Sequence, residues 1–206
     1  MTTHTMPAPI PGEPSATASA QTSRSIIPVH LAWMIRADME DVLEIEAYSK
    51  QDHPWNQDTF QSILRDRSAI GMVARQYDPT APVPPADSPR GKVLGFCIYL
   101  LEKQSLHVLN LSVHCDYRFF GIGRQIVEKL KAKLSLQKRR QVTIPVPERN
   151  LGMQLFLKQC GFRARGVLDH PPQFPNEVRY HFEYRLHADS DCTGTGSTPN
   201  AQKDRQ

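Results

Sequence analysis

The residues best suited to binding a ligand form a short turn, Arg118-x-x-Gly121-x-Gly123. An apolar segment over residues 106–113 precedes this turn, and an amphipathic segment over residues 121–136 follows it. Glycine lets the backbone turn tightly and brings its N–H groups close to a ligand. The start of a helix adds unpaired N–H donors and the positive end of the helix dipole. The order of strand, turn and helix predicts a diphosphate-binding site, with a plain strand-to-helix turn as the alternative.

Patterns of apolar residues predict the elements that position this turn. Alternating or continuous apolar stretches predict strands, and apolar residues spaced three and four apart predict helices. Strands are expected over residues 30–35, 70–76, 92–102, 105–114, 141–146, 162–168 and 180–186. Helices are expected over residues 38–49, 56–66, 121–136 and 150–160. Asp38 and Asn56 are expected to cap the first two helices, and Gly161 is expected to end the last one.

The order of these elements predicts the fold class. Three successive strands in the middle of the chain favour antiparallel pairing, and the strand–helix–strand unit around the glycine turn favours a right-handed parallel crossover. We therefore predict an α/β (α+β) fold with a mixed, mostly antiparallel sheet of seven strands and about four flanking helices.

Composition predicts a single domain with two tails. Residues 1–28 and 187–206 hold few large apolar residues, so both are expected to be disordered. Hydrophobic residues make up 39% of the chain, and their concentration in residues 29–186 gives that segment enough apolar surface for its own core. Residues 77–91 hold five of the 17 prolines and are expected to form a loop between two strands.

Charge and cysteine content favour some partners over others. The net charge of +4 suits an anionic cofactor or an acidic partner but is too small to predict nucleic-acid binding. The basic run over residues 129–140 is interpreted as a solvated helix end, with contact to a cofactor phosphate or ribosomal RNA as the alternative. The four cysteines form no Cys-x-x-Cys pair, which favours free thiols in the cytoplasm. No zinc-ligand spacing is found, and no apolar run approaches the ~20 residues of a membrane span.

The glycine turn and the element order together resemble the GNAT acyl-CoA N-acyltransferases over about residues 33–186. The most specific part is Leu111-Ser112-Val113 followed by the turn that begins at Arg118. The resemblance implies that acetyl-CoA is the donor, that the backbone of the strand segment aligns its pantetheine arm, and that the loop amides hold its pyrophosphate. It assigns cofactor binding to Leu111, Ser112, Val113, Arg118, Phe119, Phe120, Gly121, Ile122, Gly123, Arg124 and Asn150.

Two further segments resemble one branch of that family, the bacterial ribosomal-protein-alanine N-acetyltransferases. His53-Pro54-Trp55-Asn56 is similar to the Pro-Trp segment of that branch, and Asn150 begins a helix that ends in Gly161-Phe162. The resemblance implies a primary amine as acceptor, most simply the N-terminal α-amine of a protein, with a ribosomal protein as one candidate. It implies a monomer or weak homodimer that binds neither membrane nor nucleic acid directly.

The resemblance fails at two positions that matter for proton transfer. Where that branch carries a glutamate general base, this chain has Pro145, and where it carries a tyrosine general acid, this chain has Leu157. Neither side chain can move a proton. Glu148 and His114 are the substitutes considered for catalysis; their alternative roles are a charge at a helix start and a turn residue at the surface.

The acceptor side of the site is less specific in sequence. Trp55 is expected to line a peptide cleft, with a core anchor as the alternative, and Asn110 is expected to bond a substrate amide. Tyr180 and Tyr184 lie on the last predicted strand, where one could face the cleft. Three functions therefore remain open: transfer to a protein N-terminus, transfer to lysine or a small-molecule amine, and acyl-CoA binding by a catalytically weak sensor or pseudoenzyme.

Overall fold

The computed structural model describes residues 25–49, 54–76, 91–168 and 177–186. The predicted tails, residues 1–28 and 187–206, lie outside the described residues apart from residues 25–28. The predicted proline-rich loop, residues 77–91, lies outside them apart from Gly91. In the part of the chain that is described, no helix is long and apolar enough to cross a bilayer.

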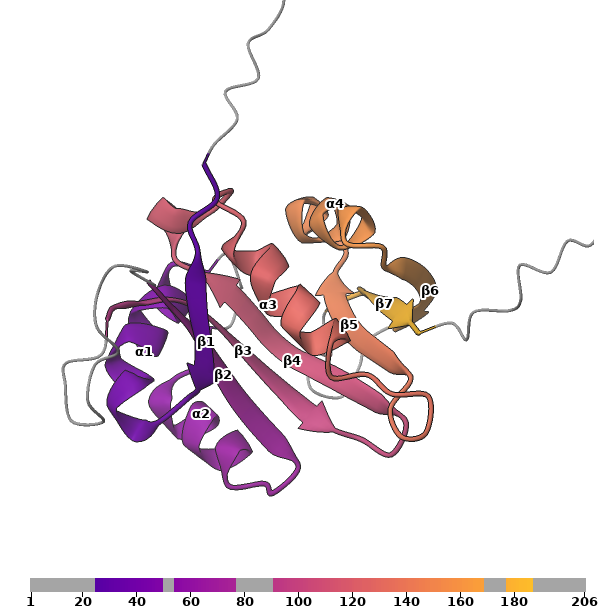
Figure 1. Ribbon diagram of the computed structural model, residues 1–206, viewed down its shortest axis with the longest axis horizontal. Helices are drawn as coiled ribbons and strands as arrows, with labels where there is room; N and C mark the ends of the chain where they lie inside the picture. The colour runs from indigo at the N-terminus through magenta and orange to yellow at the C-terminus, as the bar shows by residue number, and fades with distance from the viewer. Residues whose placement is uncertain (1–24, 50–53, 77–90, 169–176, 187–206) are drawn as a thin grey trace, which may run out of the picture.

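The predicted α/β fold is confirmed: a seven-stranded mixed sheet is flanked by four α-helices (Figure 1). The strands are β1 (Val29–Trp33), β2 (Ala69–Gln76), β3 (Val93–Leu101), β4 (Ser105–Val113), β5 (Gln141–Pro147), β6 (Arg163–Leu168) and β7 (Arg179–Arg185). The α-helices are α1 (Met39–Ala47), α2 (Gln57–Leu64), α3 (Ile122–Lys131) and α4 (Leu151–Gln159). Two short 3-10 helices, η1 (Arg36–Asp38) and η2 (Cys115–Tyr117), precede α1 and follow β4.

Two of the three predicted residues at helix ends are found in their predicted roles. Asn56 Oδ1 accepts the Thr59 amide at 2.8 Å and so caps α2 as predicted. Gly161 follows α4 with a φ of 81°, a left-handed conformation that glycine adopts without steric cost. The predicted cap at Asp38 is wrong: its carboxylate accepts the Ile35 amide at 2.9 Å instead of a donor in α1.

Helix α3 ends at Lys131, five residues earlier than the predicted end at residue 136. The amides of Lys133 and Leu134 bond the carbonyls three residues before them, which is the tighter pattern of a 3-10 turn. Lys131 Nζ donates to the Cys160 carbonyl at 2.5 Å, so the end of α3 is attached to the end of α4.

The strand order is β1-β2-β3-β4-β5-β7-β6. Every neighbouring pair is antiparallel except β4 and β5, which run parallel. Their ladder covers only Ser105–His107 of β4, paired with Gln141–Thr143 of β5. Beyond this short ladder the two central strands separate toward the end of β4, and the split is visible between them in Figure 1.

The two faces of the sheet have different covers. Helices α3 and α4 pack on the larger apolar cluster, which takes residues from β2 to β5 and from β7. Helices α1 and α2 pack on a smaller cluster on the other face, over β2 and β3. Among the described residues, the smaller cluster holds none from β5, β6 or β7.

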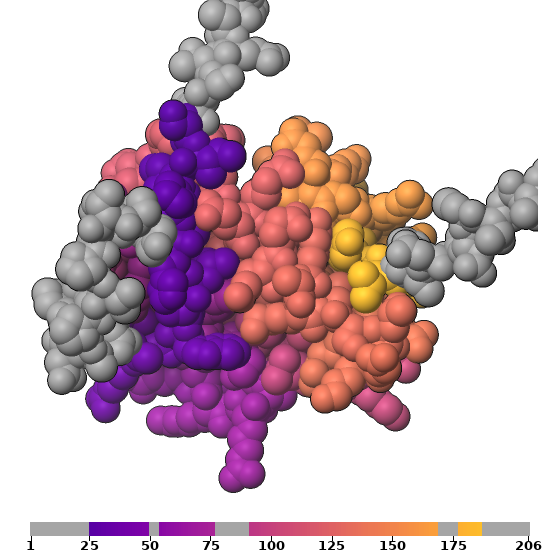
Figure 2. Space-filling view, in the orientation of Figure 1, coloured from indigo at the N-terminus to yellow at the C-terminus, as the bar shows by residue number. Residues whose placement is uncertain are grey.

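The segment before β1 is attached to the start of α3, and Figure 2 shows the residues of β1 beside that helix. The Ile27 amide donates to the Phe120 carbonyl at 3.0 Å. The Gln125 side chain accepts the Val29 amide at 3.1 Å and donates to the Ile27 carbonyl at 2.7 Å. Residues 25–28, which the sequence places in the N-terminal tail, therefore contact the turn before α3.

A buried ion pair joins η1 to the sheet. The guanidinium of Arg75, near the end of β2, bonds the Asp38 carboxylate, and both side chains are buried. Arg75 also donates to the Gly91 carbonyl at 3.0 Å. A buried ion pair adds little over a good apolar contact, but removing one partner leaves an uncompensated charge.

Arg75→Ala should lower the free energy of unfolding by about 3 kcal/mol, because the Asp38 carboxylate stays buried without its partner. Arg65→Ala, at an exposed position after α2, serves as the control and should change it by less than about 0.5 kcal/mol. Chemical denaturation followed by circular dichroism measures both values. Equal stability of the two variants would contradict this role for the ion pair.

Candidate active site

The glycine turn has the backbone geometry that the sequence predicts for anion binding. Helix α3 begins at Ile122, and Gly121, directly before it, has a φ of 78°. Phe119 has a φ of 69°, a conformation that non-glycine residues rarely adopt. The amides in the first turn of a helix have no intrahelical acceptor. The turn thus presents main-chain donors at the positive end of the α3 dipole.

Arg118 holds this turn against its surroundings. Its Nε donates to the Val113 carbonyl at 3.1 Å, and one terminal nitrogen donates to the Tyr48 carbonyl at 3.1 Å. The side chain therefore joins the end of β4 to the end of α1. The Arg118 guanidinium thus stabilises the turn. The hydrogen-bond donors predicted to bind a ligand are the main-chain amides that follow Arg118.

The two glycines of the turn have different surroundings. A Cβ atom at Gly121 would lie 3.2 Å from Ile26 Cγ2, and the positive φ adds strain for any other residue. A Cβ atom at Gly123 would lie 3.3 Å from the ring of Phe156 on α4. Close packing of α3 against its neighbours explains Gly123, whereas only the turn conformation explains Gly121.

The predicted strand segment lies along the split in the sheet. Leu111 and Val113 pack toward the cluster beneath α3, whereas Asn110 and Ser112 point toward α1. On its other side this segment pairs with β3, through Gly95 to Cys97. Its edge toward β5 has no ladder partner among the described residues. The Val113 carbonyl accepts from Arg118, and the other main-chain groups of this edge suit an extended ligand.

Asn150 lies at the opposite border of the split, between β5 and α4. Its side-chain oxygen accepts the Met153 amide at 3.1 Å and caps α4. Asn150 is thus the N-terminal cap of α4. The fold brings Asn150 to the same side of the sheet as α3. The glycine turn, the edge of β4 toward β5 and the start of α4 together border the split.

Comparison with known proteins identifies the family. The model of the acetyltransferase (GNAT) family matches residues 34–162, more than half of the 206-residue chain. The chain belongs to the GNAT family of acetyltransferases. A comparison with curated protein sequences gives no match.

Solved structures share the GNAT fold with this chain. The ribosomal-protein-S18-alanine N-acetyltransferase from Escherichia coli is 17% identical, with a TM-score of 0.61 over 80% of this chain and 98% of that chain. Ard1 from Thermoplasma volcanium is 18% identical, with a TM-score of 0.62 over 78% and 99%. NAA60 from Arabidopsis thaliana, in complex with a bisubstrate analogue, is 18% identical, with a TM-score of 0.60 over 77% and 98%.

The two positions where the resemblance leads us to expect a general base and a general acid lie on opposite faces of the sheet. Leu157 on α4 is fully buried in the larger apolar cluster. Pro145 on β5 alternates with Ile144 and Val146, which belong to that cluster, so its ring faces the α1 side of the sheet. Neither position offers a titratable group to a substrate.

Glu148, one predicted substitute, pairs with a tyrosine. The Tyr180 hydroxyl donates to Glu148 Oε1 at 3.1 Å. This hydrogen bond and the charge of the Glu148 carboxylate raise the pKa of Tyr180, so the phenol keeps its proton. Both side chains lie on the α4 side of the sheet, because Tyr180 pairs with Val146 across β5 and β7.

His114, the other predicted substitute, is buried and engaged on both ring nitrogens. Its Nδ1 accepts the Asp116 amide at 3.3 Å, and its Nε2 lies 3.6 Å from Glu44 Oε1. With Nδ1 as acceptor, the proton of the neutral ring is assigned to Nε2 and points toward Glu44. In this tautomer neither nitrogen offers a lone pair to a substrate amine.

His114 also belongs to a group of three potential metal ligands, with Cys115 and Asp116, whose ligating atoms all lie within 4.8 Å of one another. The sequence predicts no metal site. The hydrogen bond from the Asp116 amide already uses the His114 Nδ1 lone pair, and that lone pair is the one a metal would need. Cys115 and Asp116 are exposed.

Trp55 and Asn110, the two predicted acceptor contacts, meet at a residue that the sequence analysis passed over. Glu46 Oε1 accepts the Trp55 amide at 3.0 Å and the Asn110 side-chain amide at 3.0 Å. The Trp55 ring packs edge-on against Phe60, with centroids 5.2 Å apart. The structure therefore places Trp55 as a core anchor, and it binds Asn110 to α1.

Glu46 is completely buried. Burial raises the pKa of its carboxyl, and the hydrogen bonds from Trp55 and Asn110 offset only part of that effect. Its second oxygen, Oε2, and the Ser49 hydroxyl have no hydrogen-bond partner among the described residues. Glu46 follows the buried Val42 and Ile45 by four and one positions, so helical spacing alone could have identified a glutamate on the buried face of α1.

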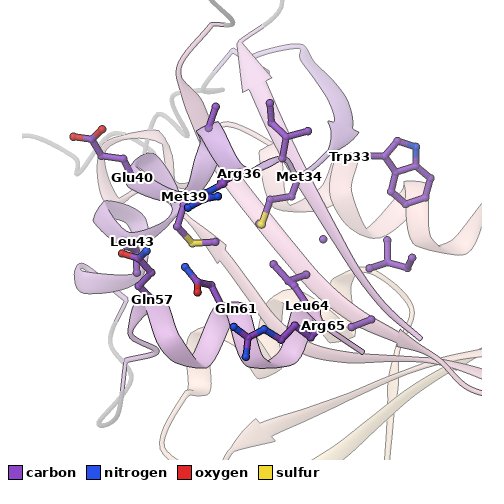
Figure 3. A pocket seen from close by; sticks show the side chains of 15 residues that line it. Trp33, Met34, Arg36, Met39, Glu40, Leu43, Gln57, Gln61, Leu64 and Arg65 are labelled. Carbon is purple, nitrogen blue, oxygen red and sulfur yellow. The ribbon is translucent and has the colours of Figure 1, made fainter. Parts of the chain in front are cut away.

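A cavity of about 1060 Å³ lies elsewhere in the molecule. Trp33, Arg36, Met39, Gln61 and Arg65 are among the side chains that line it (Figure 3). It adjoins the end of β1 and the start of β2, whereas the glycine turn adjoins the start of β1. The cavity is therefore at the end of the sheet remote from the GNAT glycine turn.

Glu46→Gln should remove a pH dependence of stability. Because the folded-state pKa of Glu46 is raised above its usual 4.5, the folded chain binds this proton more tightly than the unfolded chain. The stability that this group contributes is present below pH 4.5 and is lost as pH rises through the raised pKa. The glutamine keeps an acceptor for both amides, so the variant should be at least as stable as the parent at pH 8.

Thermal unfolding between pH 4.5 and pH 8 measures this difference. Glu40→Gln, at an exposed position of the same helix, is the matched control and should follow the parent protein throughout. If the melting temperatures of Glu46→Gln and the parent change with pH in the same way over that range, ionisation of the buried carboxyl does not lower the stability of the fold.

Proposed function

We propose that this protein is an acetyl-CoA-dependent N-acetyltransferase whose acceptor is the N-terminal α-amine of a protein. The observation that carries the proposal is the glycine turn at the split between β4 and β5, in a chain that belongs to the GNAT family. Membership of the family supports acetyl transfer, and the residues at the turn support the donor.

The residues present fit acetyl-CoA. The main-chain donors at the start of α3 suit a pyrophosphate, and the exposed Arg124 in that first turn adds a positive charge. The edge of β4 from Leu111 to Val113 suits an extended pantetheine arm, because its main-chain groups toward β5 have no ladder partner among the described residues. NAA60 from Arabidopsis thaliana has been solved in complex with acetyl-CoA, which agrees with this assignment.

The acceptor is assigned with support from the sequence and the compared structures. The Pro54-Trp55 segment and the helix that begins after Asn150 are similar to those of ribosomal-protein-alanine acetyltransferases. The E. coli structure named above is such an enzyme, and the NAA60 structure holds a bisubstrate analogue. A ribosomal protein is one candidate acceptor. The residues 169–175, which bear on the acceptor end, lie outside the described residues.

Proton transfer limits the rate in this proposal. An α-amine titrates near 8, so a usable fraction is neutral at physiological pH, and a thiolate leaves without strong acid assistance. Holding amine and thioester together supplies much of the remaining rate. Tyr180 keeps its proton through Glu148 and is the donor we assign to the departing sulfur.

The cellular setting follows from the thiols and the surface charges. Cys97 and Cys160 are buried and free, and Cys115 is exposed and free, which supports a reducing cytoplasm.

In the basic run, Lys131 and Arg139 donate to the carbonyls of Cys160 and Glu102. These contacts support the solvated helix end over a nucleic-acid surface, and we propose a monomer or weak homodimer.

A catalytically weak acyl-CoA sensor is the second candidate. The specific observation in its favour is that Pro145 and the fully buried Leu157 occupy the positions of the expected base and acid. Both functions require the same donor site, so turnover decides between them.

Arg124→Glu should weaken acetyl-CoA binding at least about tenfold, because hydrogen bonds to charged groups contribute about 1.5–3 kcal/mol each and the new carboxylate would repel the pyrophosphate. Lys129→Glu, an equal charge change at an exposed position farther along α3, is the matched control and should bind as the parent does. Isothermal titration calorimetry with acetyl-CoA measures both. Unchanged affinity in Arg124→Glu would argue against a donor site at the glycine turn.

Free-thiol release with acetyl-CoA and three acceptor sets tests the acceptor. Peptides with free N-termini should be acetylated, whereas the same peptides with blocked N-termini and internal lysines, and spermidine, should not. Turnover only on lysine or spermidine would overturn the N-terminal assignment. Acetyl-CoA binding without turnover on any acceptor would favour the sensor.

A further inference from the structure

We propose that His181 is the general base that accepts the proton of the acceptor amine, in place of the carboxylate that the resemblance places at Pro145. This inference rests on the proposed function and names a catalytic residue for it. It begins from the pairing of β5 with β7 and not from sequence spacing.

The sheet register brings His181 to the position that Pro145 leaves without a base. Pro145 and His181 are direct partners in the antiparallel β5–β7 ladder. Partners in such a ladder point to the same face, with Cβ atoms about 4.5–5.5 Å apart. His181 therefore presents an imidazole to the space that a glutamate at position 145 would reach.

The face is fixed by the neighbours of His181 on its own strand. Tyr180, Phe182 and Tyr184 all pack on the cluster beneath α3 and α4. Strand alternation then points His181 to the opposite face, the face that α1 and α2 cover over β2 to β4. His181 is half-buried, so its ring retains a solvent-accessible surface.

A second histidine adjoins His181 on that face. His107, at the last rung of the β4–β5 ladder, shares a hydrogen bond of 2.8 Å between its Nδ1 and Thr143 Oγ1. Burial lowers the pKa of His107, a charge on His181 lowers it further, and the Glu102 carboxylate opposes both. Thr143, the ladder partner of His107, lies two residues before Pro145 on β5, and Pro145 pairs with His181. Both histidines therefore lie on the same face, near the point where β4 and β5 separate.

The charged groups near His181 are paired with one another. On β7, the Glu183 carboxylate lies 3.2 Å from the Arg185 guanidinium and 3.7 Å from that of Arg165 on β6. Arg179, two residues before His181, bonds Glu177 at 2.7 Å. Strand β5 contributes only uncharged residues to this face, namely Gln141, Thr143, Pro145 and Pro147. His107 is thus the remaining titratable group from the strands beside it.

Strand β7 thereby supplies both proton-transfer groups from consecutive residues. Tyr180 lies on the α4 side with its proton held by Glu148, and His181 lies on the α1 side beside Pro145. An acceptor amine that enters from the α1 side meets the base, and the sulfur at the split is accessible to the acid.

The lone pair of the amine nitrogen forms the new bond to the acetyl carbonyl carbon, and the proton of that nitrogen passes to the neutral imidazole of His181. The carbon–sulfur bond breaks, its electron pair leaves with sulfur, and the Tyr180 hydroxyl protonates the thiolate. Solvent then removes the proton from His181 and returns one to Tyr180.

His181→Gln tests the assignment, because glutamine keeps polar contacts but cannot accept a proton. Its kcat with a free-N-terminus peptide should fall by about 10²- to 10⁴-fold at neutral pH, while its affinity for acetyl-CoA and its KM for the peptide should stay within about twofold. His30→Gln, at an exposed position on β1, should match the parent in every respect.

A gain of function guards against a merely structural effect. Pro145→Glu in the His181→Gln background places a carboxylate on the same face one strand away, and it should recover at least tenfold in kcat. Added imidazole should partly rescue His181→Gly. If His181→Gln retains the parent kcat, the inference is wrong; if its kcat falls but neither rescue succeeds, His181 has a structural role and the inference is equally overturned.

A contact measurement supports the kinetic one. In the protein saturated with coenzyme A, the NMR signals of the His181 ring should move when the acceptor peptide is added, and those of His30 should not. Stationary His181 signals at saturating peptide would overturn the contact. If the parent protein binds no acetyl-CoA, the proposed function itself fails, which is a different outcome from normal turnover in His181→Gln.

Discussion

The early end of the parallel β4–β5 ladder is the constraint on which the rest of the structure depends. After His107 and Thr143 the two central strands separate, although the sheet continues on both sides through β3 and β7. Unpaired main-chain groups inside a sheet are costly unless something satisfies them. The split therefore provides both the space and the hydrogen-bonding edge for an extended ligand, and the glycine turn directly after β4 places helix-start donors at its mouth.

The elements around the split are fixed by contacts that do not involve a ligand. Arg118 joins the end of β4 to the end of α1, and the Gln125 side chain joins the start of α3 to the segment before β1. Glu46 joins α1 to β4 through Asn110. These side-chain hydrogen bonds connect β4, α1, α3 and the segment before β1 around one turn, so contacts within the protein support the turn conformation, including the positive φ of Phe119 and Gly121.

Proton chemistry in this chain depends on β7, the strand beside β5. Because side chains alternate across a strand, Tyr180 and His181 face opposite sides of the sheet although they are consecutive in sequence. Leu157 adds apolar contacts to the core in place of a hydroxyl, and Pro145 forms no side-chain hydrogen bond. Because holding donor and acceptor together supplies much of the rate, the proposed acid and base can come from consecutive residues of one strand that face opposite sides of the sheet.

The sequence by itself determined the elements, the glycine turn and the family, because local patterns carry them: the strands and helices are found where apolar spacing predicts them, and Gly121 adopts the left-handed conformation for which glycine is suited. Local patterns also led to errors at Asp38, which bonds Arg75 instead of capping α1, and at the end of α3. Local patterns could not predict contacts between residues that are distant in sequence. Only tertiary structure placed Trp55 and Asn110 on the buried Glu46 and set His181 opposite Pro145, because strand register is decided by the packing of the whole sheet.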